Sequence, residues 1–289
     1  MKVNDKKSMK PGSFPYIWSR IRRNPGAMFG LIFVISLFIL SVISPYICKY
    51  DYAEIVMKDR FALPSSEHLL GCDEVGRDIL SRILYGAKYT LSIGILSTIF
   101  SCVIGVILGA VAGYFGGKVD TLIMRILDIF QAFPNILLAI AISAVLGKGF
   151  DKVIYAIGIS SVPNYARMMR ANILTVRNSE FIEAASSINC STFRIITHHV
   201  IPNAISPLIV QVAMGIASAA LAASSLSFLG FGVQAPTPEW GAMLASARGY
   251  VRDYPHMVII PGLFIMVTVL SFNLVGDAIR DALDPKLRD

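Results

Sequence analysis

The stretch Met28–Ile47, MFGLIFVISLFILSVISPYI, contains no charged side chain. A helix of about 20 apolar residues crosses the roughly 30 Å hydrocarbon core of a bilayer. The run is too long for the hydrophobic part of a cleaved signal, and no small-x-small cleavage site follows it. We therefore expect this stretch to be a retained transmembrane helix.

The composition of the whole chain also indicates a membrane protein. Of its 289 residues, 55% are hydrophobic and only 16% are charged, and its mean hydropathy is +0.63. Soluble domains are about a quarter charged, because polar side chains must cover their surface. The net charge of +7 would favour nucleic-acid binding in a soluble protein. Here the lysines and arginines flank apolar runs, so we expect a lipid bilayer and no nucleic acid as the partner.

Six apolar stretches are long enough to span a membrane. Each is expected to be a helix, because a single open strand would leave its backbone polar groups unpaired in lipid. The predicted fold class is therefore all-α, a polytopic membrane helix bundle with six transmembrane helices. The predicted spans are residues 28–47, 89–114, 122–146, 152–169, 205–230 and 257–277.

Basic residues near the span ends predict the orientation. They precede the first span, lie between the fourth and fifth spans and follow the sixth, and such residues favour the cytoplasmic side. We expect a multi-pass protein of the cell (inner or plasma) membrane with both termini in the cytoplasm. Residues 48–88, the outer segment, then face the outside, where Asp78–Gly86 predicts a short amphipathic helix on the bilayer surface.

Small residues follow one face of the second predicted span. Gly105, Gly109 and Gly113 are four residues apart, and such a strip lets two helices approach closely in a membrane. The strip predicts either tight packing within this bundle or a seam against a second membrane subunit.

Charged and metal-binding side chains are scarce in the predicted spans. Arg125 and Asp128 have the spacing of a local ion pair. No carboxylate lies at the middle of a span, which argues against a proton-coupled carrier. All four histidines fall outside the spans and no nucleophile–base pair is visible, so we expect no catalytic residue.

The cysteines predict neither a disulfide framework nor a metal site. They form no CxxC pair and no His/Cys cluster in the sequence. A bridge between two of them on the outer side is the one alternative. The four residues are Cys48, Cys72, Cys102 and Cys190, and the two on the outer side are Cys48 and Cys72.

The cytoplasmic stretch around residues 181–202 carries the most specific signal. Phe181-Ile-Glu-Ala-Ala begins a short predicted helix in which Glu183 is exposed beside Ala184 and Ala185, and His199-Val-Ile-Pro-Asn follows. The remaining apolar residues should seat the stretch on the membrane bundle. This shape suits insertion into a groove of a soluble partner, and the alternative is an ordinary amphipathic connector. The seating residues are Ile182, Ile188, Phe193 and Ile196.

This stretch is similar to the EAA-x3-G-x9-I-x-L-P loop of permease subunits of ABC importers. Glu183, Ala184 and Ala185 match the loop, as does Ile201-Pro202. Asn189 stands where the family usually has Gly, and His199 stands where Ile is usual. Asn can adopt the left-handed conformation expected at that bend.

Further segments extend the resemblance over essentially the whole chain. They resemble the peptide/nickel branch of these permeases, and within it the dipeptide and oligopeptide permease C chains. An acid common just before the LSFLG run is absent from Ala222–Ser225. The matching segments begin at His68 (HLLGCDEVGRD), Gly113 (GYFGG), Asp128 (DIFQAFP), Leu226 (LSFLGFGVQAPTPEWGAML) and Phe272 (FNLVGDAIRDALDP).

The resemblance implies a type I ABC importer transmembrane fold and a set of partners. These partners are a homologous permease subunit in a heterodimer, two cytosolic ATPase subunits and an extracytoplasmic solute-binding protein. ATP and Mg²⁺ would be bound by the ATPases, because this chain has no Walker motif. The chain itself would then be non-catalytic and bind no cofactor.

The implied domain layout has three parts. Residues 1–88 hold the N-terminal cytoplasmic tail, the first span and the outer segment. Residues 89–277 form the importer core, with a cytoplasmic coupling loop at 170–204, hereafter the coupling segment. Residues 278–289 form a cytoplasmic tail.

Short peptides are the expected cargo, and the alternative is nickel or a metal chelate. A bare metal ion would need imidazole or thiolate ligands along its path, and the predicted spans contain no histidine. A peptide needs a wide and mostly neutral passage, which Ser224, Ser225 and Ser227 would line. Hydrogen bonding between helices is the other interpretation of these serines. A secondary carrier would account for the spans but not for the coupling segment.

Overall fold

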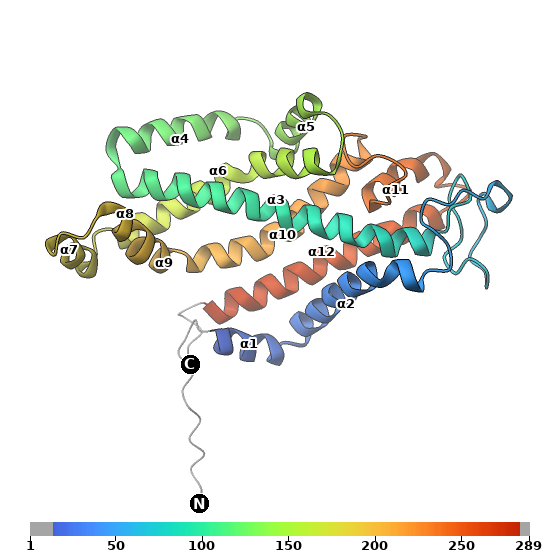
Figure 1. The fold of residues 1–289 in the computed structure, drawn as a ribbon, viewed down its shortest axis with the longest axis horizontal. Helices are drawn as coiled ribbons and strands as arrows, with labels where there is room; N and C mark the ends of the chain where they lie inside the picture. Colours follow the sequence, from blue (N-terminus) through green and yellow to red (C-terminus); the bar gives the residue numbers. More distant parts are fainter. Residues whose placement is uncertain (1–13, 284–289) are drawn as a thin grey trace, which may run out of the picture.

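The computed structural model describes residues 14–283, and helices make up most of this range (Figure 1). No strand forms among these residues, although Cys72 and Asp78 pair in an isolated antiparallel bridge. The predicted all-α class is confirmed. The basic residues 2–10 and 286–288 and the last part of the predicted tail 278–289 lie outside the described residues.

Two helices begin the described chain, α1 (Phe14–Arg23) and α2 (Pro25–Ile47). They are separated by Asn24, whose side chain accepts a hydrogen bond from the Ala27 N–H and so caps α2. Helix α2 contains the whole apolar run Met28–Ile47 and packs against α12 (His256–Leu283). The first predicted span therefore lies within a single helix that begins at its own N-cap, Asn24.

Helix α3 (Ile79–Phe115) is longer than the span predicted at 89–114. The expected surface helix Asp78–Gly86 is wrong as a separate element, because these residues form the cap and first turns of α3. Ile79 and Ile83 are buried under α11 (Trp240–Ala247), and the Trp240 indole N–H donates to the Ile83 carbonyl. The apolar side of this stretch thus packs on protein rather than on lipid.

The third predicted span, 122–146, is broken. Helices α4 (Gly117–Gln131) and α5 (Asn135–Leu146) meet at an angle of 88°. Pro134 lies between them. It has no N–H to continue the backbone hydrogen bonds of α4, and its ring disfavours a helical conformation at Phe133. Asp128 pairs with Arg125, as predicted, at 3.8 Å and also with Arg167 of α6 (Phe150–Val176).

Helices α6 and α12 contain the fourth and sixth predicted spans, and α10 (Ser206–Phe228) covers the fifth, 205–230, except for its ends. Helices α2, α3, α10 and α12 are each long and apolar enough to cross a membrane, and the bent α4–α5 pair adds a fifth candidate. Helix α6 is 27 residues long but carries polar side chains such as Asn164, Arg167 and Arg170. The six predicted stretches are thus all helical.

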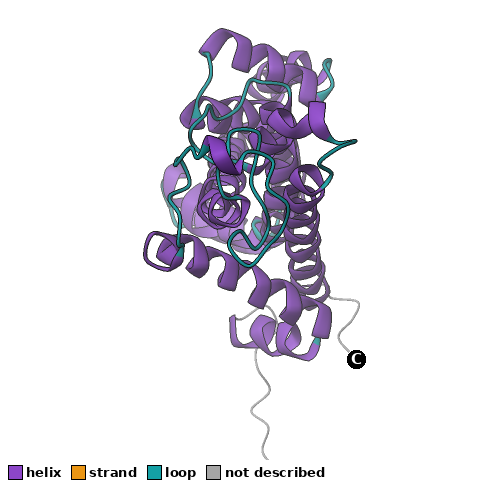
Figure 2. Ribbon diagram, turned by 90° about the vertical axis from the view of Figure 1, so that its right-hand side faces the viewer, coloured by secondary structure: helices purple, strands orange, loops and turns teal. Residues whose placement is uncertain are grey.

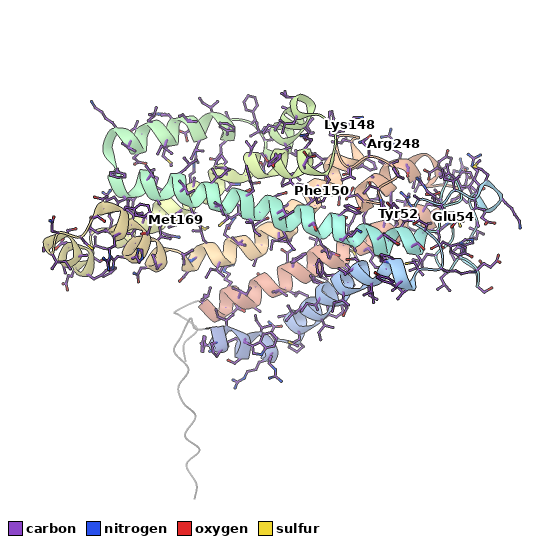
Figure 3. All side chains as sticks on the ribbon, viewed as in Figure 1. Tyr52, Glu54, Lys148, Phe150, Met169 and Arg248 are labelled. Carbon is purple, nitrogen blue, oxygen red and sulfur yellow. The ribbon has the colours of Figure 1, made fainter. Side chains whose placement is uncertain are left out.

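The bundle has two distinct ends. Helices α7, α8 and α9 protrude at one end, and the outer segment and α11 lie at the other (Figure 1). Seen along the bundle from the outer end, the loops lie in front of the helices (Figure 2). Met169 on α6 lies toward the α7–α9 end, whereas Tyr52 and Glu54 lie at the opposite end (Figure 3).

Candidate functional site

The coupling segment begins with the last turns of α6 and continues into α7 (Glu180–Ser187). Ile182 is only 4% exposed and packs with Ala185, Met169 and Ile173 in one apolar cluster. Glu183 and Ala184 face outward and are exposed. Helix α7 is therefore seated by one apolar face and presents the other face to its surroundings.

A residue in the left-handed backbone conformation follows the C-terminus of α7. Asn189 has a φ of 60°, and the Cys190 N–H reaches back to the Ala185 carbonyl at 3.2 Å. This is the pattern of a helix C-terminus that glycine usually provides. Asn189 thus adopts the left-handed conformation that we expected at this bend, where the EAA loop usually has glycine.

Three short helical pieces follow the bend, α8 (Thr192–Arg194), a π-helical turn (Ile195–Val200) and α9 (Ile201–Ala204). Pro202 has no N–H to complete an α-helical ladder, and it stands in the first turn of α9. The Asn172 side-chain amide donates to the Ala204 carbonyl at 3.1 Å and ties α9 to α6. Ile201 packs against the same cluster as Ile182.

Two of the predicted seating residues are exposed, which corrects the sequence interpretation. Ile188 is 80% exposed and Phe193 is 78% exposed. Ile195 and Val200, the first and last residues of the π-helical turn, are buried in their place. Phe181 is also exposed beside Glu183. The coupling segment therefore presents apolar side chains and a carboxylate together on its outside.

A cavity of about 610 Å³ lies among α3, α5, α6 and α10. Its lining has no charged side chain and combines apolar groups with neutral donors and acceptors. Its polar residues are Ser97, Thr98, Ser101, Asn135, Ser160, Ser161, Asn164, Tyr165, Gln211, Ser218 and Ser225.

The three serines proposed for a passage lie in different places. Ser225 lines the cavity. Ser224 is buried beside α11, where its carbonyl would lie 2.3 Å from a Cβ added to Gly241. Ser227 is buried next to Gly232. Sequence reasoning missed most of the polar lining, because single Ser and Asn residues in apolar helices form no motif.

The glycine strip brings α3 and α6 together beside the cavity. An added Cβ would lie 2.4 Å from Tyr165 Cβ at Gly105, 2.4 Å from the Ala166 carbonyl at Gly109 and 3.0 Å from Ile173 Cγ2 at Gly113. All three glycines thus make close contacts within this chain, the first of the two predicted arrangements.

The outer segment is held by buried polar side chains. The Asp73 carboxylate accepts from the Arg77 guanidinium at 2.6 Å and lies 3.5 Å from Arg82 Nε. His68 Nδ1 lies 3.0 Å from Asp78 Oδ1, and Asp78 Oδ2 accepts from the Ser81 N–H as the cap of α3. All four cysteines, including Cys48 and Cys72, are free thiols.

A second carboxylate cap lies nearby. Glu239 is buried and accepts hydrogen bonds from the Gly241 and Ala242 N–H groups at the start of α11. Burial raises the pKa of this carboxyl, and the hydrogen bonds oppose the rise. The outer end therefore buries several carboxylates that pair with arginine or histidine side chains or with backbone N–H groups.

The chain is thus a helix bundle with a neutral cavity and a protruding, partly apolar coupling segment, an arrangement that suits a subunit of a membrane transport protein. The family described as the binding-protein-dependent transport system inner membrane component matches residues 105–289. The N-terminal transmembrane domain of oligopeptide transport permease C matches residues 14–64. The chain belongs to the binding-protein-dependent transport system inner membrane component family, which confirms the resemblance seen in the coupling segment.

Curated relatives match nearly the full chain. The dipeptide transport system permease protein DppC of Alkalihalophilus pseudofirmus is 43% identical over 94% of this chain and 89% of its own length. The di/tripeptide permease DppC of Pseudomonas aeruginosa is 41% identical over 99% and 97%. The glutathione permease GsiD of Escherichia coli is 46% identical over 94% and 90%.

Solved structures share the fold. A chain of the MetNI methionine ABC transporter in inward-facing conformations matches with a TM-score of 0.56 and 19% identity, over 70% of this chain and 96% of its own. A chain of an amino acid ABC transporter matches with a TM-score of 0.51 and 17% identity, over 69% and 96%. The predicted ABC importer transmembrane fold is confirmed.

Proposed function

We propose that this chain is the permease subunit of an ATP-driven importer of short peptides. The single observation that carries the proposal is the coupling segment, which is fixed to the bundle by Ile182 and Ile195 yet exposes Phe181, Ile188 and Glu183. Exposed apolar side chains beside a charge are typical of a surface that a protein partner covers. A cytosolic ATPase subunit is the partner that the family resemblance implies.

The cavity supports a peptide as the cargo. A peptide in extended form carries amide donors and acceptors along its length, and the neutral polar lining of the cavity offers complementary groups such as Gln211 and Asn164. No histidine or cysteine lines the cavity, so a bare nickel ion would meet no suitable ligand. Relatives named for dipeptide, di/tripeptide and glutathione transport support the same class of cargo.

The remaining partners follow from the same proposal. A homologous permease subunit completes the passage as a heterodimer, a second ATPase binds that subunit, and an extracytoplasmic binding protein delivers the cargo at the outer end. The chain is then non-catalytic, and ATP and Mg²⁺ belong to the ATPases. Both termini lie in the cytoplasm, which fusion of cytoplasmic and exported reporters after residue 289 tests, since only a cytoplasmic reporter should be active there.

Uptake of labelled di- to pentapeptides and of nickel, with and without its chelator, tests the cargo. Cells that lack this chain should lose peptide uptake and regain it with the wild-type chain. Ala222→Trp, which fills the cavity, should restore little uptake, whereas Leu263→Trp on the exposed side of α12 should restore it. Intact peptide uptake together with a loss of metal accumulation would overturn the peptide assignment.

A further inference from the structure

Three metal-ligating side chains meet in the outer segment, where the sequence predicted no metal site. His68, Cys72 and Asp78 are all buried, and one ligand atom from each lies within 4.8 Å of the other two. A single ion placed among these atoms would stand at most about 2.8 Å from each before any side chain moves, because no two of the atoms are more than 4.8 Å apart. Zinc bonds to imidazole, thiolate and carboxylate are about 2.0–2.3 Å long. The present geometry is thus one small adjustment away from coordination.

The backbone fixes two of these ligands relative to each other. Cys72 and Asp78 form an antiparallel bridge, closed by hydrogen bonds from Ile79 N–H to the Gly71 carbonyl and from Asp73 N–H to the Arg77 carbonyl. Asp78 is also held by its cap on α3, which uses Oδ2 and leaves Oδ1 facing His68. A site built on such a closed turn is preorganised, because little chain entropy is lost when an ion binds.

The other ring nitrogen of His68 faces a carboxylate, the group to which histidine ligands of metals usually donate. Asp59 Oδ2 lies 3.7 Å from His68 Nε2, and the Tyr50 ring stacks on the imidazole with centroids 4.5 Å apart. A ligating histidine usually donates its second N–H to a carboxylate, which fixes the ring and strengthens the ligand. At 3.7 Å Asp59 does not hydrogen-bond to this nitrogen, but it is the carboxylate that a small movement would bring into that position.

The charge around the cluster favours a cation. Among residues 14–283, neither Asp59 nor Asp78 forms an ion pair with a lysine or arginine, since Arg77 and Arg82 are engaged by Asp73 and Glu74. The negative charges of Asp59 and Asp78 therefore face His68 without a lysine or arginine of the described chain to neutralise them. Hard ions such as Mg²⁺ and Ca²⁺ prefer oxygen ligands alone, whereas a nitrogen, sulfur and oxygen set suits Zn²⁺.

We propose that His68 Nδ1, Cys72 Sγ and Asp78 Oδ1 bind one Zn²⁺ ion or a similar borderline divalent ion, with Asp59 as the outer partner of His68. The ion replaces the proton shared by His68 and Asp78, and the Cys72 thiol proton passes to solvent. None of these residues lines the cavity, so the ion is a clamp between the outer segment and α3 rather than cargo. The proposal is independent of the proposed function.

Metal binding by the purified full chain in lipid nanodiscs tests this site. After chelator treatment, competition with a fluorescent zinc indicator should give one Zn²⁺ per chain. Co²⁺ in place of Zn²⁺ should produce the thiolate-to-metal charge-transfer absorption that only a cysteine ligand gives. This measurement uses the wild-type chain, so its outcome does not depend on whether a variant folds. An absent band, or less than one ion per chain at micromolar metal, would overturn the proposal.

Variants then assign the ligands. Cys72→Ser should abolish the Co²⁺ band, and His68→Gln should weaken binding at least as much as Asp59→Asn, for which about a tenfold loss is expected. Cys190→Ser and His198→Gln, which change the same residue types in the coupling segment, should bind metal as the wild type does. An undiminished band in Cys72→Ser would show that another thiol binds the metal and would refute the site.

Discussion

The outer segment and the coupling segment both connect transmembrane helices, yet different contacts hold them in place. In the outer segment many buried groups are polar and paired, as in the Asp73–Arg77 ion pair, and they lie beside buried apolar residues such as Ile79. In the coupling segment the buried groups are apolar, and a carboxylate and several apolar side chains remain outside. The outer segment thus pairs most of its buried charged groups within the chain, apart from Glu74 Oε2 and Arg82 Nε, which have no hydrogen-bond partner among residues 14–283. The coupling segment instead leaves a surface that a partner can cover.

Breaking the buried ion pairs of Asp73 in the outer segment should give the largest loss of stability. Asp73→Ala leaves the buried Arg82 guanidinium without its carboxylate and leaves Arg77 with Glu74 alone. Removal of one partner of a buried pair costs about 3–5 kcal/mol. We expect a clear fall in the thermal unfolding midpoint of the purified chain. Glu67→Ala removes the same charge type from an exposed site in the same segment and should change the midpoint little.

Removing an apolar contact should have the next largest effect in the coupling segment. Ile182→Ala should lower the free energy of unfolding by about 2–3 kcal/mol, because it leaves a cavity under α7. Ile188→Ala should be nearly neutral, since that side chain is exposed. Equal thermal midpoints for the two variants would mean that α7 is not seated as described.

Overpacking the α3–α6 contact should cost less. Gly109→Ala places a Cβ 2.4 Å from the Ala166 carbonyl, so the helices must separate, at about 1–3 kcal/mol. Gly262→Ala on α12 meets no atom within 4 Å and serves as the matched control. The two thermal midpoints should differ, and a Gly109→Ala chain as stable as Gly262→Ala would refute the close contact.

The smallest expected effect is at the bend of the coupling segment. Asn189→Gly should stabilise the chain by less than about 1 kcal/mol, because glycine adopts a positive φ without strain. Asn189→Ala should change stability in the opposite direction. Differential scanning fluorimetry of both variants checks the sign, and a loss of stability in Asn189→Gly would indicate that the Asn side chain itself is needed.

The sequence predicted the parts of this molecule that follow from local patterns. Apolar runs predicted all six helical stretches, and the spacing of Gly105, Gly109 and Gly113 predicted a close helix contact. The sequence could not show that Asp78–Gly86 continues into α3, because its apolar side is covered by α11 from far along the chain. It also missed the exposure of Ile188 and Phe193, which stand at the C-terminal end of α7 and in the short α8, on either side of the bend at Asn189.

Continuity in sequence decides which of the candidate sites could be recognised from the sequence. The coupling segment is continuous in sequence, so Glu183 and Ala184 could be recognised by spacing. The cavity is assembled from four helices, and the His68–Cys72–Asp78 cluster depends on a turn at 73–77 that brings its ends together. Neither of these arrangements follows from the order of residues alone.

Recovery of the ATPase subunits with the affinity-tagged chain tests the central claim most directly. Glu183→Lys puts a positive charge on the proposed docking surface, and a lost contact with added repulsion costs about 2–5 kcal/mol at an interface. We expect the wild-type chain and Glu54→Lys, which makes the same change at the outer end, to recover equal amounts of ATPase. The Glu183→Lys chain should insert normally but recover at least about tenfold less. Equal recovery by all three chains would contradict the assignment of the coupling segment as the docking site.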